Sequence, residues 1–193
     1  MKVLHLLYTS LPEKSGSSIR SHSILKSQKE NGIDVSILVA PFVKNVTLNK
    51  TYCFEGVSYK LMKSNQYTKS EDVSGIKQIF SKAISIFLFY NLVKKEIKKN
   101  KPDIIHSHSM FYCAFVGSLI SALYKIPHVY EIRSFWELRT MSKSRIKFQI
   151  YRLMENLAIL FANKLVVISS SMKYDIKNRW AAFKKKKIEI IYN

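Results

Sequence analysis

The stretch from Pro102 to Trp136 constrains the fold of this chain more than any other. It reads as a buried strand over Asp103–Ser107, a polar turn, an apolar helix over Phe111–Tyr124 and a second strand over Pro127–Ile132. A strand–helix–strand unit of this length is a βαβ crossover, which joins two parallel strands by a right-handed connection. The stretch therefore predicts a parallel sheet.

Polar side chains gather where the two strands of this unit end. His106 and His108 close the first strand, while Glu131 and Arg133 close the second and share one face of it. In open parallel sheets the ligand crevice lies outside the carboxyl ends of the strands. We expect His106 to be buried and hydrogen-bonded, and His108 to face the crevice. Glu131 and Arg133 either form a structural ion pair or, as we favour, offer Arg133 to an anion or a sugar.

Phe135, Trp136 and Glu137 follow the second strand and combine two aromatic rings with an acid. Rings that stack on a sugar and acids that bind its hydroxyls are typical of sugar sites. The same residues also suit a loop lid held by aromatic packing, and both interpretations stay open.

The remaining segments continue the alternation of strands and helices. Expected strands cover Lys2–Tyr8, Ile33–Ala40, Glu55–Met62, Lys164–Ile168 and Ile188–Asn193, and expected helices cover Ile19–Asn31, Gly75–Asn100, Ser142–Ala162 and a short stretch after Ser169–Ser171. The apolar side of the helix over 142–162 carries Ile146, Ile150, Leu153, Leu157, Leu160 and Phe161. Polar Asn65–Ser74 is expected to be a loop. About seven strands in this order indicate an α/β fold, a Rossmann-like, doubly wound and mainly parallel sheet. No repeat or linker interrupts residues 1–193, so we expect one domain.

The loop Thr9–Ser18 lies between the first expected strand and the first expected helix, where such folds bind phosphate. Gly16 lets the backbone approach a ligand, Ser17 and Ser18 add hydroxyl and N–H groups, and Arg20 adds a positive charge. The dinucleotide fingerprint G-x-G-x-x-G is absent. An ordinary capped helix start is the alternative interpretation.

The formal net charge of +19 favours anionic partners such as acidic lipid or phosphorylated small molecules. The alternative is that the lysines simply cover solvated faces. The main groups are Lys94, Lys95, Lys98, Lys99, Lys101 and Lys184–Lys187. They fit an anionic lipid surface. Aromatic residues are not interleaved with them and no nucleic-acid-binding motif occurs, so we expect no nucleic acid partner.

Several other classes of function have no support in the sequence. No apolar stretch reaches the ~18 residues of a membrane span, and Met1–Ser10 reads as a strand rather than a signal peptide. Cys53 and Cys113 have no motif spacing, which is typical of reduced thiols in a cytosolic protein. No Cys, Asp or Glu at strand spacing completes a zinc site with the two histidines. A G-x-S-x-G nucleophile elbow is also absent.

Four stretches together resemble the N-terminal domain of glycosyltransferase family 4, a family of retaining enzymes with the GT-B fold. They are KVLHLLYTSLPEKSGSSIR, PDIIHSHS, IPHVYEIRSFWE and the pair ANKLVVISSSMKYDIKNR and KKIEIIYN. The resemblance covers nearly the whole chain. It implies transfer of a hexosyl group from a nucleotide diphosphate sugar to an acceptor hydroxyl, without a metal. The chain ends at Asn193, where the family continues into its donor-binding second domain, so that domain is expected to be absent.

The resemblance also implies a site, with two departures from the family pattern. The first loop reads Ser15-Gly16-Ser17 where many members have two glycines, and Arg133 stands where many have a histidine. We expect Arg133 and His108 in catalytic positions. We expect acceptor or phosphate contacts from Ser15, Gly16, Ser17, Arg20, Glu131, Trp136 and Glu137. No cofactor is expected, and a nucleotide-sugar donor only with a second domain.

The expected function is the acceptor-binding half of a transferase for surface polysaccharide or lipid-linked glycan, inactive alone. Its partners would be a sugar or lipid-linked acceptor, an anionic membrane surface and a chain that carries the donor domain. The expected location is the cytoplasm or the inner face of the plasma membrane. Two alternatives are a non-catalytic subunit or truncated remnant that supplies a half-site or membrane anchor, and a stand-alone nucleotide-binding module of the flavodoxin type.

Overall fold

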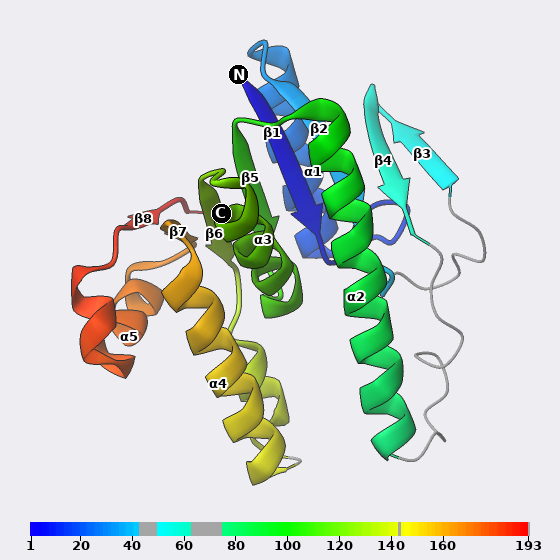
Figure 1. Ribbon diagram of the computed structural model, residues 1–193. Coiled ribbons are helices and arrows are strands. Elements are labelled where there is room, and N and C mark those ends of the chain that lie inside the picture. The colour runs from blue at the N-terminus through cyan, green and yellow to red at the C-terminus, as the bar shows by residue number, and fades with distance from the viewer. Residues whose placement is uncertain (43–49, 63–74, 143, 193) are drawn as a thin grey trace. The chain divides into compact units, whose positions relative to one another are not determined.

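The computed structural model describes residues 1–42, 50–62, 75–142 and 144–192 of the chain. Within these residues it contains eight strands and five α-helices in alternation, which confirms the α/β class (Figure 1). The expected loop Asn65–Ser74 and the terminal Asn193 lie outside the described residues. The chain divides into two compact units, Met1–Ile105 and His106–Asn193.

The first unit is a parallel sheet with one antiparallel edge strand. Its elements are β1 (Lys2–Leu7), α1 (Gly16–Glu30), β2 (Asp34–Val39), β3 (Lys50–Phe54), β4 (Val57–Leu61) and α2 (Gly75–Asn100). The strands lie in the order β3-β4-β2-β1. β1 pairs with β2 in parallel from Lys2↔Asp34 to Leu7↔Val39, and β2 pairs with β4 in parallel. β1 is buried from Val3 to Leu7 and is mostly apolar, whereas β4 alternates buried and exposed residues, as a strand with one solvent-facing side does.

A β-hairpin raises the number of strands from the expected seven to eight. β3 pairs antiparallel with β4, from Lys50↔Leu61 to Phe54↔Val57. Glu55 and Gly56 form the two-residue turn, both with positive φ (44° and 75°), as a type I′ turn requires. The expected strand Glu55–Met62 is therefore the second arm of this hairpin, and Glu55 belongs to its turn.

One hydrophobic cluster of the first unit lies between α1 and the sheet. Its buried members are Leu7, Leu25, Ile37, Val39, Val57, Tyr59 and Leu61. The inner side of α1 is polar apart from Leu25, and its buried His22 contacts the Tyr59 hydroxyl through Nδ1 at 2.7 Å. This hydrogen bond satisfies two buried polar groups at once.

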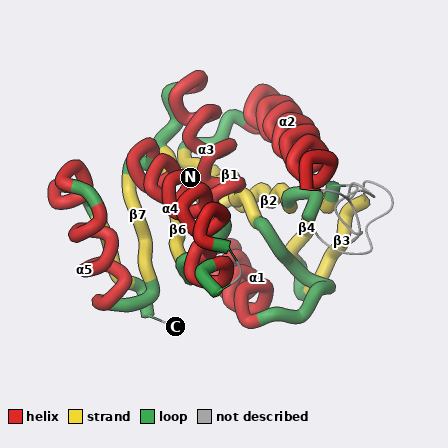
Figure 2. The backbone as a smooth tube through the Cα atoms, turned by 90° about the horizontal axis from the view of Figure 1, so that it is seen from below, coloured by secondary structure: helices red, strands yellow, loops and turns green. Residues whose placement is uncertain are grey.

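The second unit begins with the last residues of β5 (Ile104–His108). It continues with α3 (Phe111–Tyr124), β6 (His128–Ile132), the 3₁₀ helix η2 (Trp136–Thr140), α4 (Arg145–Phe161), β7 (Lys164–Val167), α5 (Ser170–Arg179), the 3₁₀ helix η3 (Ala181–Lys185) and β8 (Ile188–Ile190). β6 and β7 lie side by side and pair in parallel (Figure 2). β7 and β8 also pair in parallel. The expected crossover 102–136 is thus present with its helix bounds unchanged.

A directed chain of hydrogen bonds crosses the interior of the second unit. The Ser107 hydroxyl donates to the carbonyl oxygen of Cys113 (3.1 Å), so it accepts from Nε2–H of His128 (2.9 Å). The other nitrogen of His128, Nδ1, then carries no proton and accepts from the Ser118 hydroxyl (3.2 Å). Burial, and to a lesser extent the charge of Lys186, lowers the pKa of His128 to about 3, so the ring is neutral at physiological pH.

The orientation of α4 is the reverse of what its sequence suggests. On its expected apolar side, five residues are exposed and Leu157 is half-buried. The exposed residues are Ile146, Ile150, Leu153, Leu160 and Phe161. The buried residues are Glu155, Asn156, Ala158 and Ile159. Thus α4 packs on the second unit with a partly polar face and leaves its apolar stripe outside.

Among the described helices, none is long and apolar enough to cross a membrane.

Candidate functional site

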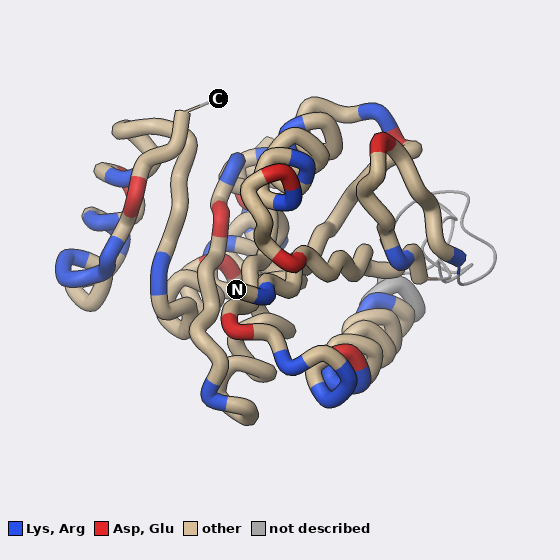
Figure 3. Tube along the Cα trace, turned by 90° about the horizontal axis from the view of Figure 1, so that it is seen from above, with Lys and Arg blue, Asp and Glu red and all other residues tan. Residues whose placement is uncertain are grey.

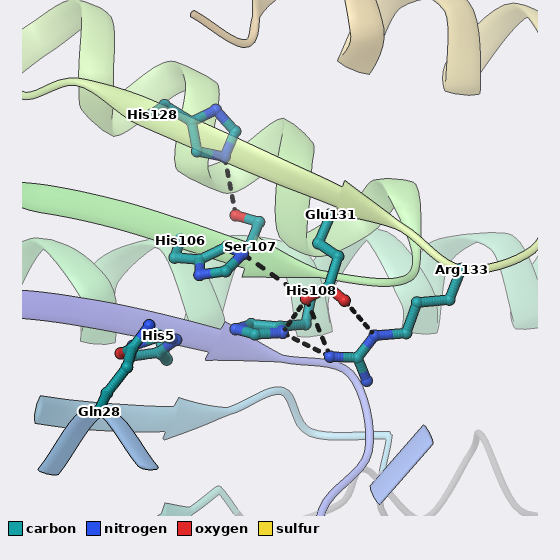
Figure 4. A network of polar contacts seen from close by, with 8 residues as sticks. All are labelled: His5, Gln28, His106, Ser107, His108, His128, Glu131 and Arg133. Carbon is teal, nitrogen blue, oxygen red and sulfur yellow. Dashed lines mark hydrogen bonds and ion pairs between the residues drawn. The ribbon is translucent and has the colours of Figure 1, made fainter. Parts of the chain in front are cut away.

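The carboxyl ends of β5 and β6 meet in the second unit, as parallel neighbours do. The backbone N–H of Ser109, just past β5, donates to the carbonyl oxygen of Glu131 in β6 (2.8 Å). This contact brings His108, Glu131 and Arg133 together at one edge (Figure 4). Side chains from two strands that the sequence placed at the same rim therefore touch.

Glu131 is the centre of the cluster. Its carboxylate accepts from Nε of Arg133 at Oε1 (3.1 Å) and from Nη2 of Arg133 at Oε2 (3.0 Å). Both side chains are almost fully covered, with 1% of Glu131 and 7% of Arg133 exposed. Two parallel N–H···O bonds fix the guanidinium plane as well as its position. The structural ion pair considered from the sequence is therefore present, and it holds Arg133 in one orientation.

His108 touches both members of this pair through a single nitrogen. Its Nδ1 lies 2.9 Å from Oε2 of Glu131 and 2.7 Å from Nη2 of Arg133. If Nδ1 carries a proton it donates to the carboxylate, and if it does not it accepts from the guanidinium. The proton on this nitrogen thus decides whether His108 binds the acid or the base.

Burial would raise the pKa of Glu131, but the surrounding donors and charges outweigh it. The hydrogen bond and charge of His108 and the charge of Arg133 hold the pKa of this carboxyl well below its ordinary value. Glu131 is therefore ionised at any physiological pH, and its negative charge balances that of the guanidinium.

His106 completes the cluster from the same face of β5. Its ring stacks on that of His108 with centroids 4.0 Å apart, and its Nε2 lies 3.6 Å from Oε2 of Glu131. Burial, with the neighbouring His108, holds the pKa of His106 well below its ordinary value. Two histidines and a carboxylate are common metal ligands, but here Arg133 bonds both oxygens of Glu131, and a cation would have to displace the guanidinium.

The acid that follows β6, Glu137, pairs with an arginine of α5. Glu137 is buried and pairs with Nη2 of Arg179 from α5 at 2.7 Å. The guanidinium of Arg179 also lies over the ring of Phe135, 3.9 Å from its centroid, while that of Arg139 lies over Trp136 at 4.3 Å. These contacts hold the loop after β6 in place by aromatic and ionic packing, as the loop-lid interpretation expects. Sugar contact by Trp136 and Glu137 stays a prediction.

The sequence analysis missed a second buried cluster beneath this loop. The Tyr130 hydroxyl donates to Oε1 of Glu155 (2.7 Å), and Nη1 of Arg179 donates to Oδ1 of Asn156 (3.4 Å). Burial raises the pKa of Glu155 to about 8, with a further contribution from the charge of Glu137. The signal that could have indicated this cluster is the single acid in the otherwise apolar and basic helix 145–161.

The expected phosphate-binding loop belongs to the first unit. Ser15 is the N-cap of α1, and its hydroxyl accepts from the backbone N–H of Ser18 (3.1 Å). A methyl group on Gly16 would meet no atom within 4 Å, so open space surrounds this residue. Ser17 and Arg20 are partly exposed on the first turn. The capped helix start is therefore real, and ligand contact at these four residues stays a prediction.

Another polar contact in the first unit joins β1 to α1. Nε2 of His5 lies 2.9 Å from Oε1 of Gln28 (Figure 4). This hydrogen bond satisfies a fully buried histidine within the sheet–helix interface.

Comparison with known proteins gives one family and several related structures. Residues 15–193 match the family described as Glycosyltransferase Family 4. An alpha-maltose-1-phosphate synthase of Mycobacterium tuberculosis is 32% identical over 92 residues, which cover 47% of this chain and 24% of that protein. This chain therefore spans much less than the whole of that relative.

Two solved glycosyltransferase structures have the same fold. A sucrose-phosphate synthase from Thermosynechococcus elongatus superposes with a TM-score of 0.69 and 12% identity, over 100% of this chain and 48% of that one. CalG4, the calicheamicin glycosyltransferase, superposes with a TM-score of 0.57 and 10% identity, over 98% of this chain and 52% of that one. This chain thus spans about half the length of the structures that it matches.

Proposed function

Because this chain belongs to glycosyltransferase family 4, we propose that it is the acceptor-binding half of a retaining, nucleotide-sugar-dependent hexosyltransferase. Its acceptor would be a growing surface polysaccharide or a lipid-linked glycan. The chain spans 48% of the sucrose-phosphate synthase that it superposes on. The proposal therefore includes a donor-binding domain that is not among these residues, and little or no turnover without it.

The observation that carries this proposal is the arginine held at the carboxyl ends of β5 and β6. Glu131 binds the Arg133 guanidinium through two hydrogen bonds and His108 lies 2.7 Å from it. An arginine fixed in this way is preorganised for an anion, since it loses little freedom when a ligand binds. Charge develops on the diphosphate of a nucleotide sugar as it leaves, and a preorganised cation there lowers the barrier.

Each member of the cluster would have its own role. Arg133 would contact the diphosphate or a sugar hydroxyl, and His108 would contact the reacting groups or steer the guanidinium through the proton on Nδ1. Glu131 would act as a positioning residue, because both of its oxygens already bind Arg133. No metal or cofactor is included in this proposal.

The remaining predicted contacts are with the acceptor. Ser15, Gly16, Ser17 and Arg20 would bind its phosphate or hydroxyl groups at the N-terminus of α1, where backbone N–H groups favour anions. The ring of Trp136 would stack on a sugar. Glu137 is the weakest member of the set, because its carboxylate is buried against Arg179.

We also propose a cytoplasmic location that includes the inner face of the plasma membrane. The lysines on the last turns of α2 and those at 184, 185 and 187 are mostly exposed, and they would attract anionic head groups. Lys186 differs from its neighbours, because its ammonium group donates to the carbonyl oxygen of Leu160 at 2.7 Å.

A binding experiment on the intact chain tests the proposal. Isoprenyl-phosphate-linked sugars and free nucleotide sugars (UDP-glucose, UDP-N-acetylglucosamine and GDP-mannose) would be titrated separately and followed by calorimetry. We expect the lipid-linked sugar to bind and the nucleotide sugars not to. Adding the donor domain encoded nearest to this gene should give a product with the anomeric configuration of the donor.

Variants locate the binding to the cluster. Arg133→Gln should weaken acceptor binding or turnover about tenfold or more, as expected for the loss of hydrogen bonds to a charged group. Arg133→Lys keeps the charge and should recover part of the loss. Lys125→Gln is the control, because it removes an exposed charge that precedes β6, at the end of the strand opposite the cluster. Tight binding of a nucleotide sugar by the chain alone would instead favour a stand-alone nucleotide-binding module. Turnover with a partner that is insensitive to Arg133→Gln would favour a non-catalytic subunit.

A further inference from the structure

The outer face of α4 is apolar along the whole helix. Ile146 is 74% exposed, Ile150 52%, Leu153 51%, and Phe161, near the C-terminal end, 57%. Their spacing of four, three and eight residues keeps them on one side of a helix with 3.6 residues per turn. Scattered exposed apolar residues are normal on a protein surface, whereas a continuous stripe indicates a partner.

The inner face of α4 shows that this orientation is specific. Glu155 accepts a hydrogen bond from the Tyr130 hydroxyl, and Asn156 accepts one from Arg179. Both groups are buried and would lose these partners if the helix turned its stripe inward. Such a rotation would expose Ala158 and Ile159 and would leave the buried Tyr130 hydroxyl without its acceptor. The stripe is thus held on the outside by polar contacts on the opposite side.

The charges around the stripe have one sign. From Leu138 to Lys164 the sequence contains a single acid, Glu155, and it is buried. The exposed basic residues among the described positions of this segment are Arg139, Arg145, Lys147, Arg152 and Lys164. Lys147 lies on one flank of the stripe, and Arg145 and Arg152 on the other, as a helical projection shows. An apolar stripe between basic flanks is the pattern of a helix that lies in the surface of an anionic membrane.

We propose that α4 docks the second unit on an anionic lipid surface, with its apolar stripe inserted among the head groups and its arginines and lysines on lipid phosphates. A helix of 17 residues is about 25 Å long. That is less than the ~30 Å hydrocarbon core, so α4 would lie parallel to the membrane. A second copy of this chain is a poor occupant, because each copy carries a net charge of +19, with Lys and Arg far more numerous than Asp and Glu along the trace (Figure 3). The basic flanks of two α4 helices would therefore repel each other.

This inference deepens the proposed function, since a lipid-linked acceptor would be presented at the same surface. It rests on that function only for the source of the acceptor. Vesicle binding requires neither donor nor acceptor, so the two proposals can fail separately.

The test is flotation of the intact chain with vesicles, either of phosphatidylcholine alone or of phosphatidylcholine and phosphatidylglycerol in equal parts. We expect binding to the anionic vesicles only, and less of it as salt concentration rises. The triple variant Ile146→Gln, Ile150→Gln and Leu153→Gln should lower the partition coefficient on the order of a hundredfold, from the lost apolar burial. Arg152→Gln alone should lower it about fivefold.

Two control variants separate α4 from other exposed apolar residues. Leu119→Gln with Leu123→Gln makes the same change on α3, which has exposed leucines but no charged residue, and should leave binding unchanged. Phe80→Gln with Phe87→Gln makes the same kind of change on α2 in the first unit. All of these side chains are exposed and glutamine is a good helix former, so the variants should fold.

Four outcomes would overturn the proposal. They are absence of binding to anionic vesicles, unchanged binding by the triple α4 variant, loss of binding by the α3 control, and complete loss by the α2 variant while the α4 variant still binds. Sedimentation equilibrium tests whether a second copy of this chain occupies the stripe instead. A dimer that the triple variant converts to monomer would assign the stripe to that second copy.

Discussion

Replacing Arg133 with methionine would leave the carboxylate of Glu131 buried without its guanidinium partner. The two side chains share two hydrogen bonds near 3 Å and are 1% and 7% exposed, so water cannot replace the lost contacts. Removing one partner of a buried ion pair costs about 3–5 kcal/mol. His108 remains 2.9 Å from the same carboxylate, so we expect the lower end of that range.

A second substitution tests whether this cost comes from the uncompensated charge of Glu131. Glu131→Gln alone leaves the nearly buried guanidinium of Arg133 without its carboxylate and should likewise cost about 3–5 kcal/mol. In the double variant Glu131→Gln, Arg133→Met, neither charge is left uncompensated in the interior. The double variant should therefore be more stable than Arg133→Met alone, although it contains one more substitution.

The loss of folding stability caused by Arg133→Met should also depend on pH. Without the guanidinium, Glu131 loses a positive charge and two hydrogen bonds that lower its pKa, so the pKa of this carboxyl should rise. Because the parent and the variant share the same unfolded state, the loss of stability should grow as pH rises toward the pKa of Glu131 in the variant and stay constant above it. Arg133→Lys, which keeps a charge, should show a smaller deficit at every pH.

The assay is urea unfolding followed by tryptophan fluorescence. The chain contains two tryptophans, Trp136 and Trp180, and both belong to the second unit. The signal therefore reports on the unit that contains the ion pair. A double variant less stable than Arg133→Met, or an Arg133→Met variant as stable as the parent protein, would refute this account of the cluster.

Three further predictions concern single substitutions. Gly117→Ala places a methyl carbon 2.6 Å from Nε2 of His128 and should destabilise the second unit by about 1–3 kcal/mol in the fluorescence assay, whereas Gly16→Ala, in open space, should change stability little. Burial raises the pKa of Glu155 to about 8, so stability should fall as pH rises from about 4.3 toward that value, by up to about 1.4 kcal/mol per pH unit, and Glu155→Gln should flatten this profile. Ser15→Ala removes the cap of α1 and should cost about 1 kcal/mol, measured by circular dichroism because the tryptophans report on the other unit. Unchanged stability of Gly117→Ala or of Ser15→Ala would contradict the close contact or the cap. An unchanged pH profile of Glu155→Gln would contradict the burial of this acid.

The elements predicted best are those with strong local patterns. The helix Phe111–Tyr124 has the bounds expected from its apolar run, and β6 (His128–Ile132) differs from its prediction by one residue. The hairpin turn at Glu55 and Gly56 was missed, because four of the five β3 residues are exposed and show no apolar alternation. Local pattern predicts buried strands well and exposed edge strands poorly.

The orientation of α4 could not be predicted from its own residues. Helical spacing placed its apolar residues on one side, but the direction of that side depends on distant partners. Glu155 is held by Tyr130, 25 residues away, and Asn156 by Arg179, 23 residues away. A periodic pattern defines two faces of a helix, and only tertiary contacts decide which one is buried.

The candidate site was predictable in part for the same reason. Glu131 and Arg133 are two residues apart on a strand, so their common face followed from the sequence. The contact of both with His108 requires β5 and β6 to be neighbours, which the crossover predicted. The pair Glu137 and Arg179 joins residues 42 positions apart, and no local pattern indicated it.

The directed hydrogen bonds around His128 make its ring a reporter of opening in the second unit. Because the Ser107 hydroxyl points to Cys113, the imidazole proton resides on Nε2 and is sealed from water. That proton can exchange with solvent only when β5, β6 and α3 separate. Its nitrogen-15 resonance and its exchange rate would therefore measure, at one atom, how often this part of the protein opens.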